Sequence, residues 1–127
     1  MEQKLSERKR WGIVARAKSF AYAFRGIKIL VKTTPNFIIQ ILLAIFAIFL
    51  GSKFHISHSE WLILIISIGS VFVTETINTA IEIDVNLTSP NYHPYARDIK
   101  DVSAGAVLIS AIVACIIGFI IFLPKII

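Results

Sequence analysis

Three long runs of mainly apolar residues are separated by polar segments along this chain. They cover residues 35–51, 61–85 and 102–123, and prolines mark their limits, with Pro35 opening the first run and Pro124 following the third. A helix needs about 20 residues to cross a bilayer, within a range of about 17–25, so each run is long enough. Proline also suits the first turn of a helix. The pattern predicts an all-α integral membrane protein with three transmembrane helices.

Residues 1–33 are basic, and nine of the 13 Lys and Arg residues lie in them. This basic part is too long for the start of a cleaved signal peptide, so we expect it to remain in the mature protein. Apolar residues recur in it at helical spacing, which predicts an amphipathic helix at the membrane surface with its basic face toward anionic headgroups. A nucleic-acid-binding arm is the alternative, but its Gly/Arg or aromatic-stacking pattern is missing, and we expect no nucleic acid partner. The apolar positions are Phe20, Phe24, Ile27 and Val31.

The composition excludes several classes of protein. Of the 127 residues, 56% are hydrophobic and 17% are charged, whereas soluble domains carry about 25% charged residues. A soluble enzyme and a disordered tail are therefore excluded. The single Cys115 cannot form an intrachain disulfide, which excludes a disulfide scaffold. We expect one membrane domain, residues 1–127.

The distribution of basic residues predicts the orientation of the spans. With the N-terminus in the cytoplasm, only Lys53 and Lys125 of the 13 basic residues lie outside. The reverse orientation would place the basic N-terminal segment outside, against the positive-inside rule. We therefore expect a multi-pass protein of the cell (inner) membrane, with a cytoplasmic N-terminus and an external C-terminus.

The second run becomes polar near its end, and its polar residues share one helix face. Glu75, Asn78, Thr79 and Glu82 are spaced i, i+3, i+4 and i+7, and Asn86 extends the face by one turn. Carboxylates are costly in a bilayer unless they face protein or a wet cleft. Such a face can hold a hard cation with one acid and leave the other as a base. Alternatively, both acids only bind other helices or reach the interface.

The segment 89–101 contains prolines and an asparagine that should interrupt the helix, and it ends at Lys100 and Asp101. A lysine at this boundary is either an interfacial anchor or a point charge for a phosphate, which Asp101 would help to orient. The small residues 103–106 then permit close contact with another helix, of this subunit or another.

Common nucleotide-binding patterns are missing. The chain has neither GxxxxGK[ST] nor GxGxxG, and no HRD or DFG pattern. Its three histidines fall on opposite membrane sides in the expected topology, so we expect no zinc site.

Several segments together resemble the small prokaryotic membrane diacylglycerol kinase family, which includes undecaprenol kinases. The likeness covers roughly residues 16–124. Its most specific part is a pair of segments, in which the lysine of the second follows the last glutamate of the first by 18 residues. The segments are SFAYAFRG at 19–26, PNF at 35–37, ETINTAIE at 75–82, YHP at 92–94 and KDVSAGAV at 100–107.

The resemblance implies a homotrimer of three-span subunits with a surface helix. It also implies transfer of the γ-phosphate of ATP, with Mg²⁺ as cofactor, to the hydroxyl of a lipid alcohol at the cytoplasmic interface. The acceptor would be diacylglycerol, giving phosphatidic acid, or alternatively undecaprenol. By this resemblance, Glu75 would be the catalytic base, with Asn78 beside it, and Glu82 would bind Mg²⁺ and contact ATP. Arg16 and Glu75 would contact the lipid. The further ATP contacts would be Tyr22, Asn91, Tyr92, His93, Lys100 and Asp101.

The chain departs from the family pattern at two positions. Many members carry a glutamate where this chain has Thr34, and an aspartate where it has Asn86. Fewer acids predict a weaker or differently built metal site, or reduced activity.

Two other functions remain open from the residues alone. A non-catalytic membrane subunit would use its buried acids only to hold an oligomer together. An ion conductor would need polar residues along the full depth of a span, whereas here they gather at one end of the second run.

Overall fold

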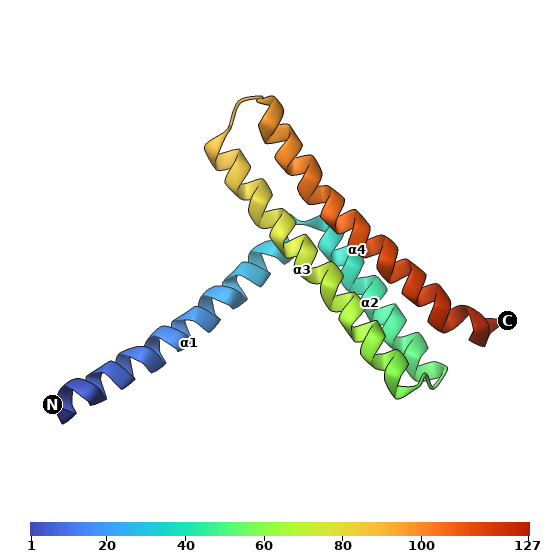
Figure 1. The fold of residues 1–127 in the computed structure, drawn as a ribbon, viewed down its shortest axis with the longest axis horizontal. Coiled ribbons are helices and arrows are strands. Elements are labelled where there is room, and N and C mark those ends of the chain that lie inside the picture. The colour runs from blue at the N-terminus through green and yellow to red at the C-terminus, as the bar shows by residue number, and fades with distance from the viewer. The chain divides into compact units, whose positions relative to one another are not determined.

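The computed structural model describes residues 1–127, which form four helices and no strand. The helices are α1 (Glu2–Thr33), α2 (Pro35–Lys53), α3 (His58–Thr88) and α4 (Pro94–Ile126) (Figure 1). The last three are long and apolar enough to cross a membrane, which confirms the predicted all-α membrane class. The chain divides into two units, one holding α1 and the other holding α2 to α4.

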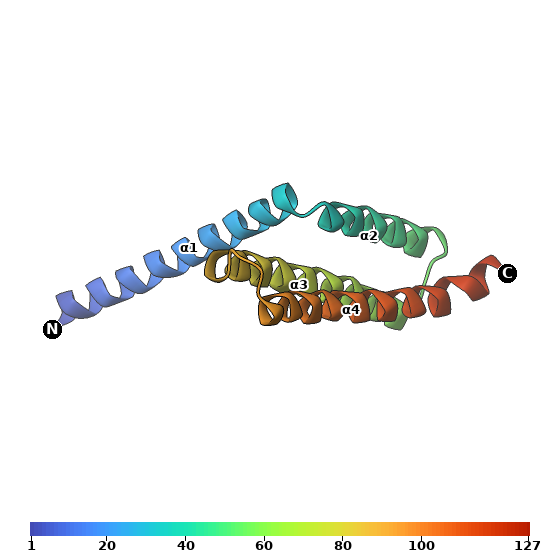
Figure 2. The ribbon, with the colours of Figure 1, turned by 90° about the horizontal axis from the view of Figure 1, so that it is seen from above.

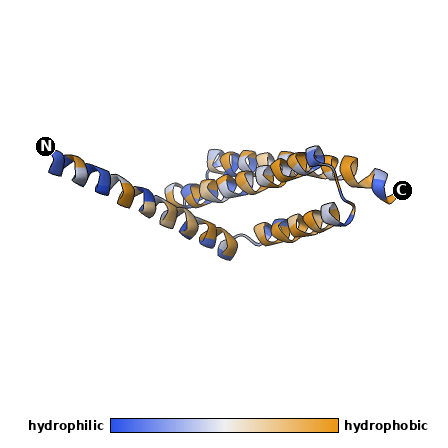
Figure 3. Ribbon diagram, turned by 90° about the horizontal axis from the view of Figure 1, so that it is seen from below, coloured by the Kyte–Doolittle hydropathy of each residue, from blue (hydrophilic) through white to orange (hydrophobic).

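Helix α1 leaves its apolar positions exposed. Phe20 and Phe24 are each 69% exposed and Ile27 is 51% exposed. The first turns of the helix are mainly hydrophilic, whereas α2 to α4 are mainly hydrophobic (Figure 3). A helix with this division can lie at a membrane surface with its aromatic rings among the lipids.

In the second unit, α3 and α4 run antiparallel and lie side by side along most of their length (Figures 1 and 2). Helix α2 is shorter and runs alongside one half of α3. Large apolar side chains cover the outside of this unit, while Ser67, Glu75, Asn78, Thr79 and Ser103 are buried. Lipid surroundings favour this arrangement, in which apolar residues lie outside and polar residues lie inside.

The end of the unit farther from the α3–α4 connection is tied together by packing and by an ion pair. Ile56, Leu64, Ile121 and Phe122 form its buried cluster. Gly51 is required in α2, because a Cβ there would lie 2.7 Å from the Trp61 ring. The same end carries an ion pair between Lys125 Nζ in α4 and Glu60 Oε1 in α3, 2.9 Å apart. Glu60 also closes a capping box with Ser57 at the start of α3.

The helices extend beyond the expected runs. Helix α3 continues through the polar stretch as expected and ends at Thr88. The expected interruption is present but is limited to residues 89–93. The expectation that it extends to residue 101 is wrong, because α4 begins at Pro94. Proline is favoured at a first helical position, and the His93 Nδ1 accepts the Tyr95 backbone N–H at 3.2 Å as a cap. At the other end, Pro124 lies inside α4 instead of ending it.

Candidate active site

Glu75 is the most deeply buried carboxylate of the described fold. It lies on α3, is 2% exposed, and its Oε2 accepts a hydrogen bond of 2.7 Å from Gln40 Nε2 on α2. A buried charge needs such a partner, because isolation in an apolar region is costly. The prediction that this acid faces the protein interior is therefore confirmed.

The next turn of α3 continues the buried polar face. Asn78 and Thr79 are each 7% exposed. The Thr79 hydroxyl lies 3.1 Å from the hydroxyl of Thr34, the residue before α2. The oxygens Asn78 Oδ1 and Gln40 Oε1 are buried and have no hydrogen-bond partner. Such orphaned acceptors are rare in native structures, so this region is suited to a ligand that brings hydrogen-bond donors.

Glu82 has different surroundings from Glu75, although both lie on one face of α3. Glu82 is exposed. The contact between Thr34 and Thr79 places the start of α2 at the level of Thr79, so the later part of α3 extends beyond α2. Seven residues separate the two acids, which corresponds to about 10 Å along a helix. One acid is thus enclosed and the other is accessible.

The acids do not gather into a preformed metal site. The chain contains no group of three or more His, Cys, Asp or Glu side chains that could hold a metal ion. Magnesium, however, is commonly bound by one or two carboxylates together with the phosphates of a substrate. An exposed single carboxylate such as Glu82 fits that mode of binding, in which the nucleotide supplies most of the ligands.

A cavity of about 250 Å³ lies at the connection between α3 and α4. It brings together four residues of the predicted nucleotide contacts, and no carboxylate lines it. Lys100 Nζ donates to Asn86 Oδ1 across the two helices, and Arg97 Nη1 donates to the Tyr92 hydroxyl at 3.4 Å. Arg97 also forms an exposed ion pair with Asp98, 3.5 Å away, which is a weak contact in water. Because Lys100 and Arg97 line the cavity and no acid does, the cavity is suited to an anion. Its residues include Asn86, Asn91, Tyr92, His93, Arg97 and Lys100.

Other predicted residues lie outside this cavity. Asp101 is exposed on α4 and is not among the residues of the cavity wall. Arg16 and Tyr22 are exposed on α1, in the other unit of the chain. The described geometry therefore brings together the contacts from the α3–α4 connection with Lys100, and does not include Asp101 among them.

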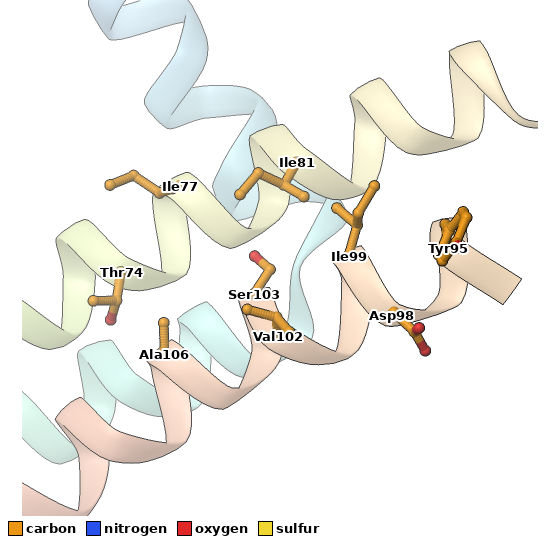
Figure 4. Close-up of a pocket in the computed structure, with 9 residues that line it drawn as sticks. All are labelled: Thr74, Ile77, Ile81, Tyr95, Asp98, Ile99, Val102, Ser103 and Ala106. Carbon is orange, nitrogen blue, oxygen red and sulfur yellow. The ribbon is translucent and has the colours of Figure 1, made fainter.

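A larger cavity of about 540 Å³ opens between α3 and α4 and is mainly apolar (Figure 4). Ile77 and Ile81 of α3 lie along it with Val102 and Ile99 of α4, and Asp98 is its one charged residue. None of the predicted catalytic residues lines it. Its lining fits an alkyl chain and offers little for the chemistry of a phosphate.

Two residues of the site escaped the sequence-based predictions. Gln40 was detectable as the single polar residue between Phe37 and Leu50, a position that is costly in a bilayer without a partner. Arg97 precedes Lys100 by three residues, so the two share one helix face. The spacing became informative once α4 was found to begin at Pro94.

Comparison with known proteins gives concordant matches. The family described as prokaryotic diacylglycerol kinase matches residues 21–122. An undecaprenol kinase of Bacillus subtilis is 43% identical over 85% of this chain and 88% of its own length. A diacylglycerol kinase of Synechocystis is 36% identical over 84% of this chain, which covers 61% of that protein. A diacylglycerol kinase of Helicobacter pylori is 34% identical over 75% of this chain and 74% of its own length. The chain therefore belongs to the prokaryotic diacylglycerol kinase family.

Proposed function

We propose that this protein is an ATP-dependent lipid kinase that phosphorylates the hydroxyl of diacylglycerol to give phosphatidic acid. The observation that carries the proposal is Glu75, a carboxylate that is 2% exposed, held by Gln40 and next to the orphaned Asn78 Oδ1. Family membership supplies the reaction class, and this acid supplies a group that can accept the proton of an alcohol.

In the proposed reaction, Glu75 takes the proton from the lipid hydroxyl. The hydroxyl oxygen then forms a bond to the γ-phosphorus of ATP, the bond between that phosphorus and the β–γ bridging oxygen breaks, and ADP leaves. Asn78, which lies one turn along α3 from Glu75, is the proposed neighbour of the lipid headgroup beside the base. Phosphoryl transfer needs mainly positioning and charge neutralisation, so a base, a metal ligand and a few cations suffice.

Glu82 is the proposed ligand of Mg²⁺, which would neutralise charge on the phosphates of ATP. The cavity at the α3–α4 connection is the proposed nucleotide site, with Lys100 and Arg97 as its cations. Asn86 in its wall lies eleven residues beyond Glu75, or about 16 Å along the helix. The nucleotide therefore has to extend along α3 past Glu82 to bring its γ-phosphate to the base. Further ATP contacts are proposed for Asn91, Tyr92, His93, Asp101 and Tyr22, and lipid contact for Arg16.

The proposed assembly is a homotrimer in the cell (inner) membrane, with the N-terminus inside and the C-terminus outside. This orientation places the α3–α4 connection, and with it Lys100, in the cytoplasm where ATP is present. Gly105 supports close association with another subunit, because a Cβ at this position would meet nothing within 4 Å inside the chain. Its open surroundings leave the small face of α4 available to a partner helix.

Undecaprenol is a second candidate acceptor, and the specific observation favouring it is the 43% identity to a protein named undecaprenol kinase. Both alcohols would present a hydroxyl to Glu75 from the membrane, so the base itself cannot distinguish them. Purified protein in mixed micelles with ATP and Mg²⁺ should be assayed with each lipid in turn. A higher kcat/KM for diacylglycerol supports the primary proposal, and a higher value for undecaprenol replaces it with the second.

A further inference from the structure

We propose that Gln40 is a positioning residue for catalysis, which fixes the orientation of the Glu75 carboxylate and so selects the oxygen that receives the proton. This inference rests on the proposed function and adds a residue from a different helix to it. The contact that carries it is the 2.7 Å hydrogen bond from Gln40 Nε2 to Glu75 Oε2.

The surroundings of Gln40 argue against a role in holding the helices together. Gln40 is the single polar residue between Phe37 and Leu50 of α2. Its amide is only half satisfied, because Nε2 donates to Glu75 while Oε1 is buried without a partner. An unsatisfied buried oxygen costs about 1–3 kcal/mol. Gln40 thus contributes little net stability as a link between the helices, and its one hydrogen bond serves the buried carboxylate of Glu75.

The direction of the hydrogen bond determines what remains free on Glu75. An ionised carboxylate only accepts hydrogen bonds, so Nε2 of Gln40 is the atom that must face it. The bond engages one lone pair of Oε2. Oε1 accepts nothing from Gln40 and is the oxygen that takes the proton of the lipid hydroxyl. A base with one oxygen fixed reacts from a narrower set of orientations, and misplacement by about 1 Å can cost on the order of 100-fold in rate.

Gln40 also separates Glu75 from an apolar interior. It lines a cavity of about 320 Å³ between α2, α3 and α4, whose other walls are formed mostly by apolar side chains such as Leu43, Phe46 and Phe72. Gln40 is the one residue of these walls that donates a hydrogen bond to the Glu75 carboxylate.

The test compares Gln40→Leu with a matched control, Ser110→Ala. Ser110 on α4 makes a 2.7 Å contact with Thr74, the residue before Glu75 on α3, so the control removes another interhelical hydrogen bond without touching the base. We expect Gln40→Leu to lower kcat by about 10–100-fold, the equivalent of one hydrogen bond to a charged group. The KM for ATP should stay unchanged, and Ser110→Ala should keep kcat near that of the wild type.

A double-variant measurement separates positioning from packing. If Gln40 acts through Glu75, Gln40→Leu should cause no further loss of kcat in a Glu75→Gln background. Should Gln40→Leu fail to fold, Gln40→Asn replaces it, because its shorter amide cannot reach the carboxylate, and the same selective loss is expected. Equal losses in Gln40→Leu and Ser110→Ala, a parallel rise of KM, or additive losses in the double variant would overturn the inference. An active wild type with these results would leave the proposed kinase function standing, whereas an inactive wild type would remove that function itself.

Discussion

The substitution Glu75→Gln isolates the proposed base from its structural role. The new side chain has the same size, so it fits the same buried position, where the carboxylate is 2% exposed. Its carbonyl can still accept from Gln40, as the carboxylate does at 2.7 Å. Its amide group introduces donors into a region that holds two buried oxygens without partners, Gln40 Oε1 and Asn78 Oδ1.

The expected magnitudes follow from these contacts. Turnover should fall by about 10²–10⁴-fold, the usual contribution of a positioned proton acceptor. The thermal midpoint in micelles should stay equal or rise, because a buried charge is removed while the hydrogen bond from Gln40, worth about 0.5–1.5 kcal/mol between neutral groups, is kept. Binding of ATP and Mg²⁺ should change little, because the proposed metal ligand Glu82 and the residues of the nucleotide cavity are unchanged in this variant.

The assay measures kcat, nucleotide affinity and the thermal midpoint on the same preparations. The matched comparison is Glu82→Gln, which removes an exposed acid from the same face of α3. That variant should raise the Mg²⁺ concentration needed for half-maximal activity and weaken ATP binding, because an amide is a poorer ligand for a hard cation. Full activity in Glu75→Gln, or collapse of assembly in both variants, would refute the assignment of a catalytic base and favour a purely structural use of the acids.

Three further predictions concern the metal, the nucleotide and the membrane. Thr34→Glu should lower the Mg²⁺ concentration needed for half-maximal activity by about tenfold, because Thr34 contacts Thr79 at 3.1 Å on the face of α3 that carries Glu82. An added carboxylate contributes at least about 1.4 kcal/mol to the binding of a nearby divalent cation. An unchanged Mg²⁺ titration would place the metal elsewhere. Lys100→Met should raise the KM for ATP by about 10–100-fold with a smaller effect on kcat, and initial rates over a range of ATP would show an unchanged KM if the cavity were not the nucleotide site. In intact cells that produce a variant without Cys115, an impermeant thiol reagent should modify a cysteine placed at Ser57 and leave one placed at Ser89 unmodified. The opposite labelling pattern would reverse the orientation.

The sequence predicted the presence of the helices more accurately than the residues at which they begin and end. Apolar runs of spanning length predict helices because a bilayer leaves the backbone few alternatives. The predicted beginning of α4 was wrong, because the prolines and Asn91 suggested a longer interruption. Pro94 instead takes the first helical position, with His93 as its cap. A proline thus starts the helix that it was expected to delay.

The site was predictable where it depended on one helix. The spacing of Glu75, Asn78 and Thr79 placed them on a common face, and all three are buried. The exposure of Glu82 was not predictable, because it depends on where α2 begins relative to α3. The bond from Gln40 to Glu75 likewise joins residues 35 positions apart, and such pairing is set by the packing of two helices, which a single helical period does not determine.

Transfer of phosphate from ATP to a membrane lipid by this protein can be measured directly with γ-labelled ATP. Purified protein in micelles containing diacylglycerol and undecaprenol should be incubated with labelled ATP and Mg²⁺, and the lipids then extracted and separated. We expect a labelled lipid phosphate whose formation needs Mg²⁺ and is reduced by about 10²–10⁴-fold in Glu75→Gln. A folded wild-type protein that labels neither lipid, or a Glu75→Gln variant that labels as fast as the wild type, would contradict it.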